Sequence, residues 1–495
     1  MTVLSELPKS RMTRIFAAAL LLGATICIPP AQALDLSDCR ISAGPGAPSI
    51  AARCGELIRP LDPDNPDAGS IALKVAVVAA LSLEPASDAL VPIAGGPGGS
   101  SIEFYASWSH AFERVRHERD ILLVDQRGTG ESAPLTCDVG EDLVEGAFSL
   151  EETVRATEEC LAALPHDPRY FTTSVAVRDL EALREALGYE ALNLYGVSYG
   201  TRVAQHYARR YPDTTRTVII DGVVPPQLPL GPEIASESQR AMERVLERCS
   251  SEPDCSDRFP QVHEDFRRLR DTLAAGPVSV SIANPVTGTP ETMEFSETHM
   301  AAAFRLLLYD ARTIALLPLV ISEAAGGNYA PLAAQFQMSV PSLAESLSIG
   351  MHNAVVCTED SPFIDDDAID REALEASYLG PAQLDAIQAM CSVWPRGPMD
   401  ENLRTPLATD SPVLLLSGDA DPITPPRYAQ LAAVDLEQAW LLTGKNQGHG
   451  LGAVGCLPRV IGAFIESMKL EDGIDDCISD SFAMPFFLDY SGPMP

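Results

Sequence analysis

Two kinds of hydrophobic pattern alternate along this chain. Short runs that are apolar almost throughout are typical of buried strands, and stretches with apolar residues three and four apart are typical of helices. An apolar stretch at 71–83 predicts early sheet strands. Further strands are predicted at 89–93, 121–124, 191–195, 217–220, 413–416 and 439–442, and helices at 151–164, 174–187 and 201–210. Strands that alternate with helices predict an α/β fold with a doubly wound, mostly parallel sheet.

The strand pattern stops near Pro225-Pro226 and resumes at residue 413. Helical patterns fill the interval, at 235–248, 263–274, 298–324 and 371–390. We expect an inserted, mainly helical cap over the carboxyl edge of the sheet, where ligands bind in doubly wound folds. The alternative is an independent second domain without a role in binding. The predicted division is a first core part at 34–226, the cap at 227–408 and a C-terminal core part at 409–495.

The N-terminal 33 residues read as a targeting segment. Three basic residues precede an apolar run at 15–28, and the triplet 31–33 (AQA) fits a small-x-small cleavage site. A membrane anchor is the alternative, but the run is short for a bilayer span of roughly 20 residues and ends in two prolines. The sequence therefore predicts a signal peptide at 1–33, export to a periplasm or the medium, and no membrane association of the mature chain.

The cysteines agree with export. The chain has 11, of which Cys27 lies in the predicted signal peptide, and an even remainder suits an oxidising compartment. No Cys or His cluster has zinc-ligand spacing, so neither a metal nor another cofactor is expected. Local spacing suggests the pairs Cys39 with Cys54, Cys137 with Cys160, Cys249 with Cys255, Cys357 with Cys391 and Cys456 with Cys477.

The composition of the 495 residues is that of a globular protein, with 46% hydrophobic and 21% charged residues. The formal net charge is −34. A chain this acidic, without a basic stripe or an aromatic-interleaved lysine patch, is not expected to bind nucleic acid.

One pentapeptide, Gly196-Val197-Ser198-Tyr199-Gly200, follows an apolar strand and precedes a helical pattern. G-x-S-x-G in that context is a nucleophile elbow, in which a strained serine is lifted above the sheet and small neighbours let strand and helix approach. Ser198 is therefore the predicted nucleophile.

A serine nucleophile needs an imidazole as base and a carboxylate to orient it. His449, between two glycines in the loop after the last predicted strand, is the only histidine after residue 352. The turn after the strand at 413–416 supplies the acid, for which Asp421 is preferred and Asp419 is the alternative. The non-catalytic role of Asp419 would be that of a turn residue whose side chain hydrogen-bonds to nearby backbone. Ser198, Asp421 and His449 follow the chain order that an elbow serine requires.

Attack on a carbonyl also needs N–H donors for the oxyanion. One predicted donor is the backbone N–H of Tyr199, directly after the nucleophile. The other is Gly96, in the glycine-rich loop 95–99 (GGPGG). That loop lacks the pattern and the lysine of a phosphate-binding loop, so nucleotide binding is not expected.

Five segments together are similar to the prolyl aminopeptidase and tripeptidyl aminopeptidase branch of the α/β-hydrolases. The resemblance implies a serine exopeptidase that releases short units or single residues from peptides with free N-termini through an acyl-enzyme, and it implies that Asp125 and Arg127 brace the glycine loop. From about residue 405 the chain resembles the C-terminal domain of the secreted tripeptidyl aminopeptidases. Relatives often carry His before the glycines, where this chain has Ala94. The five segments are GGPGG (95–99), DQRGTGES (125–132), GVSYG (196–200), GDADPITPP (418–426) and GHG (448–450).

The resemblance also reaches the predicted cap. Its motif of a cysteine followed two residues later by an acid matches Cys357 and Glu359, which makes Glu359 the leading anchor for a substrate's α-amine and Asp360 the second. The neighbouring acidic run 365–367 favours the alternative, a solvated loop. The competing function for the whole chain is a carboxylesterase or other acyl hydrolase with the same three catalytic residues.

Overall fold

The structure is a computed structural model that describes residues 34–44, 46–137, 149–285, 287–470, 473–474, 478 and 483–492. The predicted signal peptide lies outside these residues, and so does Cys477. Among the residues described, no helix has the length and apolar character of a membrane span.

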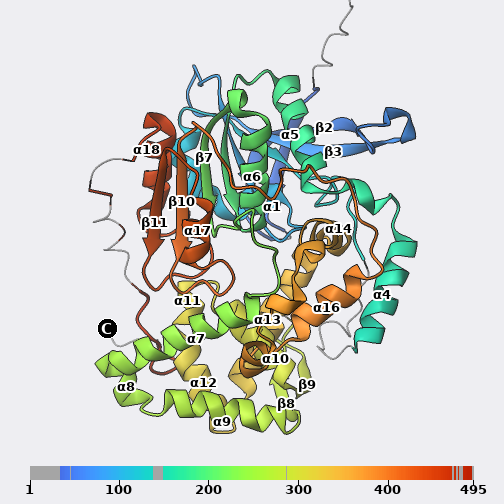
Figure 1. Ribbon diagram of the computed structural model, residues 1–495. Helices are drawn as coiled ribbons and strands as arrows, with labels where there is room; N and C mark the ends of the chain where they lie inside the picture. Colours follow the sequence, from blue (N-terminus) through green and yellow to red (C-terminus); the bar gives the residue numbers. More distant parts are fainter. Residues whose placement is uncertain are drawn as a thin grey trace, which may run out of the picture. The chain divides into compact units, whose positions relative to one another are not determined.

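A nine-stranded sheet forms the centre of the fold (Figure 1). The three strands nearest the N-terminus are antiparallel to their neighbours, and the following ones are parallel to one another. The strand order is β1 (Ser37–Ser42), β2 (Ser49–Pro60), β3 (Ser70–Val78), β5 (Ile121–Val124), β4 (Ala89–Ile93), β6 (Leu192–Val197), β7 (Thr215–Asp221), β10 (Val413–Gly418) and β11 (Ala439–Gly444). The α/β fold with a mostly parallel sheet, predicted from the alternating pattern, is confirmed.

Helices cover both faces of the sheet because its strands are apolar on both sides. In β10, for example, Val413 and Leu415 pack into one hydrophobic cluster, whereas Leu414 and Leu416 pack into the other. The first face is covered by α5 (Thr173–Leu187), α6 (Tyr199–Arg210) and α17 (Pro426–Ala432), and the second by α1 (Ser101–Trp108), α2 (Glu113–Arg116) and α18 (Leu457–Ser467). A further helix, α4 (Leu150–Ala163), begins at a capping box on Ser149.

Residues 227–408 lie between β7 and β10, and we call them the cap segment. This segment has a hydrophobic core of its own. Ala420, from the turn after β10, packs into that core, so the cap segment adjoins the carboxyl ends of the strands. Figure 1 shows α7 to α13 gathered on one side of the sheet. The helices are α7 (Ile234–Ser251), α8 (Pro253–Arg258), α9 (Val262–Ala274), α10 (Glu297–Leu307), α11 (Ala311–Ile314), α12 (Leu317–Ala325), α13 (Ala330–Ser346), α14 (Ile349–Glu359), α15 (Arg371–Ala376) and α16 (Ala382–Cys391).

The cap segment differs from the predicted helical pattern in two ways. It contains an antiparallel hairpin, β8 (Val278–Ala283) and β9 (Pro290–Phe295), which the sequence reading did not predict. The single helical pattern at 298–324 folds as α10, α11 and α12, because Asp310 caps a new helix by accepting from the Arg312 N–H. The predicted boundaries of the cap, at 226/227 and 408/409, stay predictions.

Four disulfides join the cysteine pairs that local spacing suggests: Cys39–Cys54, Cys137–Cys160, Cys249–Cys255 and Cys357–Cys391. Cys456 is also disulfide-bonded, and its predicted partner Cys477 lies outside the described residues. The Cys357–Cys391 bond ties α14 to α16 within the cap segment.

Candidate active site

Ser198 stands between the end of β6 and the start of α6, in a strained backbone conformation. Its φ is 55° and its ψ is −124°, angles that a residue with a side chain rarely adopts. A Cβ on Gly196 would lie 2.2 Å from the Gly200 carbonyl oxygen, and one on Gly200 would lie 2.3 Å from that of Ile93. The two glycines are therefore required for the close approach of strand and helix that presents Ser198 at the sheet edge.

Asp421 and His449 meet at the same edge. His449 Nδ1 lies 2.8 Å from Asp421 Oδ2. The other Asp421 oxygen accepts from the backbone N–H groups of Ile423 (2.8 Å) and Thr424 (2.9 Å), and the Thr424 hydroxyl donates to Oδ2 over 2.6 Å. The carboxylate is thus fully buried and fixed in orientation, and it keeps the proton of the imidazole on Nδ1.

The attraction between Asp421 and His449 shifts their pKa values in opposite directions. Burial by itself would raise the pKa of Asp421, but the attraction and hydrogen bond of His449, with those of Thr424, outweigh it and hold the pKa below 3.8. Burial by itself would lower the pKa of His449, but Asp421 outweighs it and raises the pKa above 6.5. An imidazole that a buried carboxylate orients, and that it stabilises when protonated, is suited to act as a general base.

Asp419, the alternative acid, has a different partner among the described contacts. Its carboxylate accepts from the Asn446 backbone N–H over 2.6 Å and stabilises that turn. Among the described contacts, only Asp421 of the two aspartates bonds to His449.

The His449 loop lies against the strand ends that carry Ser198. The Ser198 N–H donates to the Asp221 carbonyl oxygen over 2.9 Å, and a Cβ on the next residue, Gly222, would lie 2.9 Å from His449 Cε1. A Cβ on Gly450 would lie 3.7 Å from the Val197 side chain. Among the described residues Ser198 Oγ makes no hydrogen bond to the imidazole.

The glycine loop lies over the nucleophile. A Cβ on Gly95 would lie 2.8 Å from Ser198 Cβ and 3.4 Å from Oγ, so a side chain there would block the serine. Within the described residues, neither the Gly96 N–H nor the Tyr199 N–H has a hydrogen-bond acceptor. Gly96 adopts a φ of 113°, which favours glycine.

The two residues expected to brace this loop behave differently. Asp125 accepts from the Ser100 hydroxyl (2.7 Å) and the Ile102 N–H (3.1 Å), directly after the loop. Among the described contacts Arg127 makes no hydrogen bond to the loop: it forms a buried ion pair with Asp179 and donates to backbone carbonyls at Pro60, Leu61 and Tyr170. These bonds direct the guanidinium toward α5 and the end of β2, and the expected bracing of the glycine loop by Arg127 stays a prediction.

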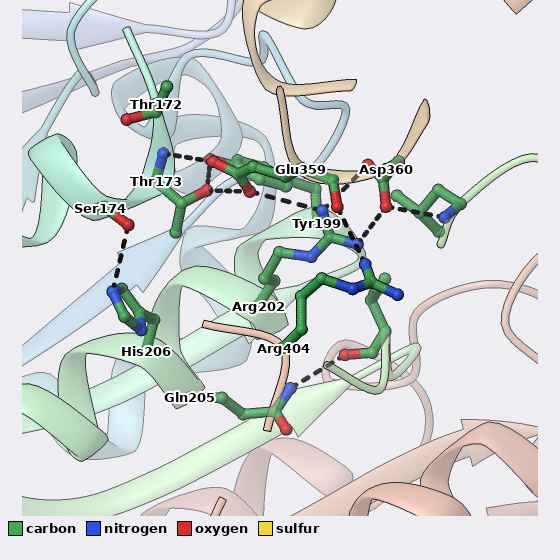
Figure 2. A network of polar contacts seen from close by, with 12 residues as sticks. Thr172, Thr173, Ser174, Tyr199, Arg202, Gln205, His206, Glu359, Asp360 and Arg404 are labelled. Atoms are coloured by element: carbon green, nitrogen blue, oxygen red, sulfur yellow. Dashed lines mark hydrogen bonds and ion pairs between the residues drawn. The ribbon is translucent and has the colours of Figure 1, made fainter. Parts of the chain in front are cut away.

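Glu359 and Asp360 are fully buried and already have partners (Figure 2). Asp360 forms a two-pronged ion pair with Arg202 at 2.6 and 3.0 Å. Glu359 accepts from the Thr173 N–H (2.7 Å) and hydroxyl (2.8 Å), and burial, partly offset by Arg202, raises its pKa to about 7. Their predicted role as amine anchors stays a prediction.

Three residues near the imidazole were not identified from the sequence. Asp221 accepts from the Tyr195 hydroxyl (2.6 Å) and from the Leu451 and Gly452 N–H groups, which holds the His449 loop to β7. Thr424 donates to the acid, and the Tyr309 carbonyl accepts from the His449 N–H over 2.8 Å. Asp221 could have been found from the sequence, because it ends an apolar strand. Tyr309 reaches the site only through the fold of the cap segment.

Two family descriptions match the chain. Residues 88–306 match the alpha/beta hydrolase fold, and residues 376–477 match the TAP-like protein family. The second match includes Asp421 and His449, and the first includes Ser198.

Curated relatives with three different names are similar to the chain. It is 27% identical to the serine protease Hip1 of Mycobacterium tuberculosis over 474 residues, which cover 88% of this chain and 89% of that protein. It is 26% identical to the tripeptidyl aminopeptidase of Streptomyces coelicolor over 467 residues, covering 86% and 82%. It is 25% identical to carboxylesterase B of Mycobacterium tuberculosis over 269 residues, covering 48% and 51%.

Proposed function

Because this chain is an α/β-hydrolase with a TAP-like C-terminal part, we propose that it is an exported serine exopeptidase. It removes short units or single residues from peptides with free N-termini. Two relatives that align along most of the chain, named a serine protease and a tripeptidyl aminopeptidase, support a peptidase. The disulfides support export, since such bonds persist in oxidising compartments.

Ser198 is the nucleophile of the proposed reaction. His449 takes the proton from Ser198 Oγ as that oxygen attacks the peptide carbonyl, and Asp421 stabilises the imidazolium that forms. The N–H groups of Tyr199 and Gly96 stabilise the oxyanion. His449 then gives its proton to the leaving amine, and a water molecule activated by His449 hydrolyses the acyl-enzyme.

The observation that carries the proposal is the hydrogen bond between His449 and the buried Asp421, formed by a loop that packs against Val197 and Gly222 at the nucleophile's own strand ends. A buried carboxylate fixes the imidazole tautomer in the same way in enzymes that transfer acyl groups through a serine. The Ser198 Oγ–His449 bond is expected to form when substrate excludes water from the site.

The pH dependence follows from the His449 pKa. Only the neutral imidazole accepts the serine proton, and Asp421 raises the pKa above 6.5. We therefore expect kcat/KM to fall as the pH falls through a value above 6.5, and a profile in buffers of constant ionic strength measures it. A profile that stays flat to well below pH 6.5 would contradict the assignment of His449 as base.

A carboxylesterase is the second candidate, favoured by the similarity to a relative of that name over about half of this chain. The same three residues would then act on an ester, and the α-amine would not be recognised. The two candidates differ in how the substrate's N-terminus affects the rate.

A series of p-nitroanilides tests the choice. One-, two- and three-residue anilides with free N-termini are compared with their acetylated forms and with p-nitrophenyl acetate. We expect the free amines to be cleaved and acetylation to lower kcat/KM on the order of 100-fold, since a site that recognises a charged amine loses that interaction. Equal rates with and without the acetyl group, or turnover of the ester alone, would favour the esterase.

A further inference from the structure

The two proposed oxyanion donors lie on separate segments, Gly96 in the loop 95–99 and Tyr199 at the start of α6. Their spacing must match one oxygen atom, because such donors act at 2.7–3.1 Å from it. A single helix of the cap segment, α14, contacts both segments, one at each of its ends.

The N-terminal end of α14 holds the glycine loop. The Ser348 N–H donates to the Gly98 carbonyl oxygen over 3.0 Å, and Leu347 forms an antiparallel bridge with Gly99. His352 Nδ1 lies 3.3 Å from the Pro97 carbonyl oxygen. A Cβ on Gly98 would lie 2.9 Å from the Ser348 carbonyl oxygen, so the two segments are as close as backbone allows.

The C-terminal end of α14 holds the Tyr199 side chain through a chain of hydrogen bonds (Figure 2). The Tyr199 hydroxyl lies 2.7 Å from Thr173 Oγ1, which donates to Glu359 over 2.8 Å. Gln126 Nε2 donates to the Tyr199 hydroxyl over 3.0 Å. Because the Thr173 hydroxyl gives its one proton to Glu359, it accepts from the Tyr199 hydroxyl, and the bonds run in one direction, from Gln126 through Tyr199 and Thr173 to Glu359.

The same end of α14 is tied to α6 a second time. Asp360, the residue after the helix, pairs with Arg202, which lies one turn after Tyr199. Arg404 donates to the Glu359 carbonyl oxygen over 2.9 Å, so a second arginine lies beside the two acids. Both acids therefore already have partners among the described contacts.

The helix between these two ends is held on all sides. Nearly every residue of α14 is buried, including Asn353 and Thr358, and Cys357 is bonded to Cys391 of α16. A displacement at one end is therefore transmitted to the other, since packed interiors do not deform easily.

We propose that α14 is a brace that sets the distance between the two oxyanion donors, and that Glu359 and Thr173 are its positioning residues on the Tyr199 side. The inference rests on the proposed acyl-transfer function, but not on which acyl group is cleaved.

Glu359→Gln and Thr173→Val break the chain of hydrogen bonds at two different groups, and only the first changes a buried charge. The readout is kcat and KM on a free-amine anilide and on p-nitrophenyl acetate, which has no amine. We expect kcat to fall on the order of 10- to 100-fold on both substrates, with KM changed by less than about threefold, since misplacing a reacting group by about 1 Å costs up to about 100-fold.

Three controls complete the design. Asp367→Asn is a matched acid-to-amide change at an exposed position in the same part of the cap segment and is expected to leave both substrates unaffected. Thr173→Ser restores the hydroxyl and is expected to restore kcat. Tyr199→Phe removes a hydroxyl from this series of hydrogen bonds and changes no charged group. It therefore tests the proposal even where Glu359→Gln unfolds the protein.

Two results would overturn the brace. One is a loss confined to the free-amine substrate and expressed in KM, which would assign Glu359 to amine binding. The other is unchanged kcat in folded Thr173→Val and Tyr199→Phe. If the wild type cleaves the ester but no peptide, the exopeptidase proposal fails, and the ester data still test the brace.

Discussion

Replacing Ser198 with alanine is expected to lower kcat about 10⁶-fold, the loss seen when the nucleophile of a Ser-His-Asp hydrolase is removed. Among the described residues, the nearby Tyr195 and Tyr199 hydroxyls are already hydrogen-bonded, and water cannot form the acyl-enzyme. Hydrolysis of the best anilide substrate measures the loss, with highly concentrated enzyme for the variant.

The control for this variant is a measurement of its thermal stability. Because Ser198 Oγ makes no hydrogen bond among the described residues, its loss is expected to leave the thermal midpoint within a few degrees of the wild type. Residual activity above about 1% of the wild type, after contamination is excluded, would contradict Ser198 as nucleophile.

Replacing Asp421 with asparagine is expected to lower kcat about 10⁴-fold, because an amide no longer fixes the Nδ1–H tautomer of His449. The variant also removes the charge that raises the His449 pKa, so the acid limb of kcat/KM is expected to move to lower pH. The pH profile distinguishes this loss from simple misfolding, which would lower the rate without moving the limb.

Asp419→Asn is the matched control. The two aspartates lie in the same turn, but Asp419 bonds only to the Asn446 backbone among the described contacts, so its change is expected to cost less than about tenfold. If Asp419→Asn were the more damaging variant, the assignment of the acid would be reversed.

The central sheet could be predicted from the sequence because its strands are buried on both faces. The runs at 89–93 and 121–124 fold as β4 and β5 with the expected bounds. The outer strands β1 and β2 were missed, since residues such as Arg53 and Glu56 interrupt their pattern. The hairpin β8–β9 was missed because most of its residues are exposed or half-buried and no continuous apolar run marks it.

The candidate site was predictable where backbone chemistry leaves a local pattern. Ser198 is marked by flanking glycines, at which a Cβ would prevent the close approach of strand and helix. The turn around Asp421 is marked by its place after an apolar strand. The partners of Glu359 left no such pattern, because Thr173 and Arg202 lie far from it in sequence. The acidic run 365–367 is exposed as a solvated loop would be, yet Glu359 is fully buried.

The measurement that tests the central claim most directly is the site of covalent labelling. The full-length protein is treated with a fluorophosphonate at several pH values, and the modified peptide is mapped by mass spectrometry. The account predicts one adduct, on Ser198, that forms more slowly as His449 is protonated and is absent from Ser198→Ala. An adduct on another serine, or none in a folded protein that still hydrolyses substrate, would contradict it.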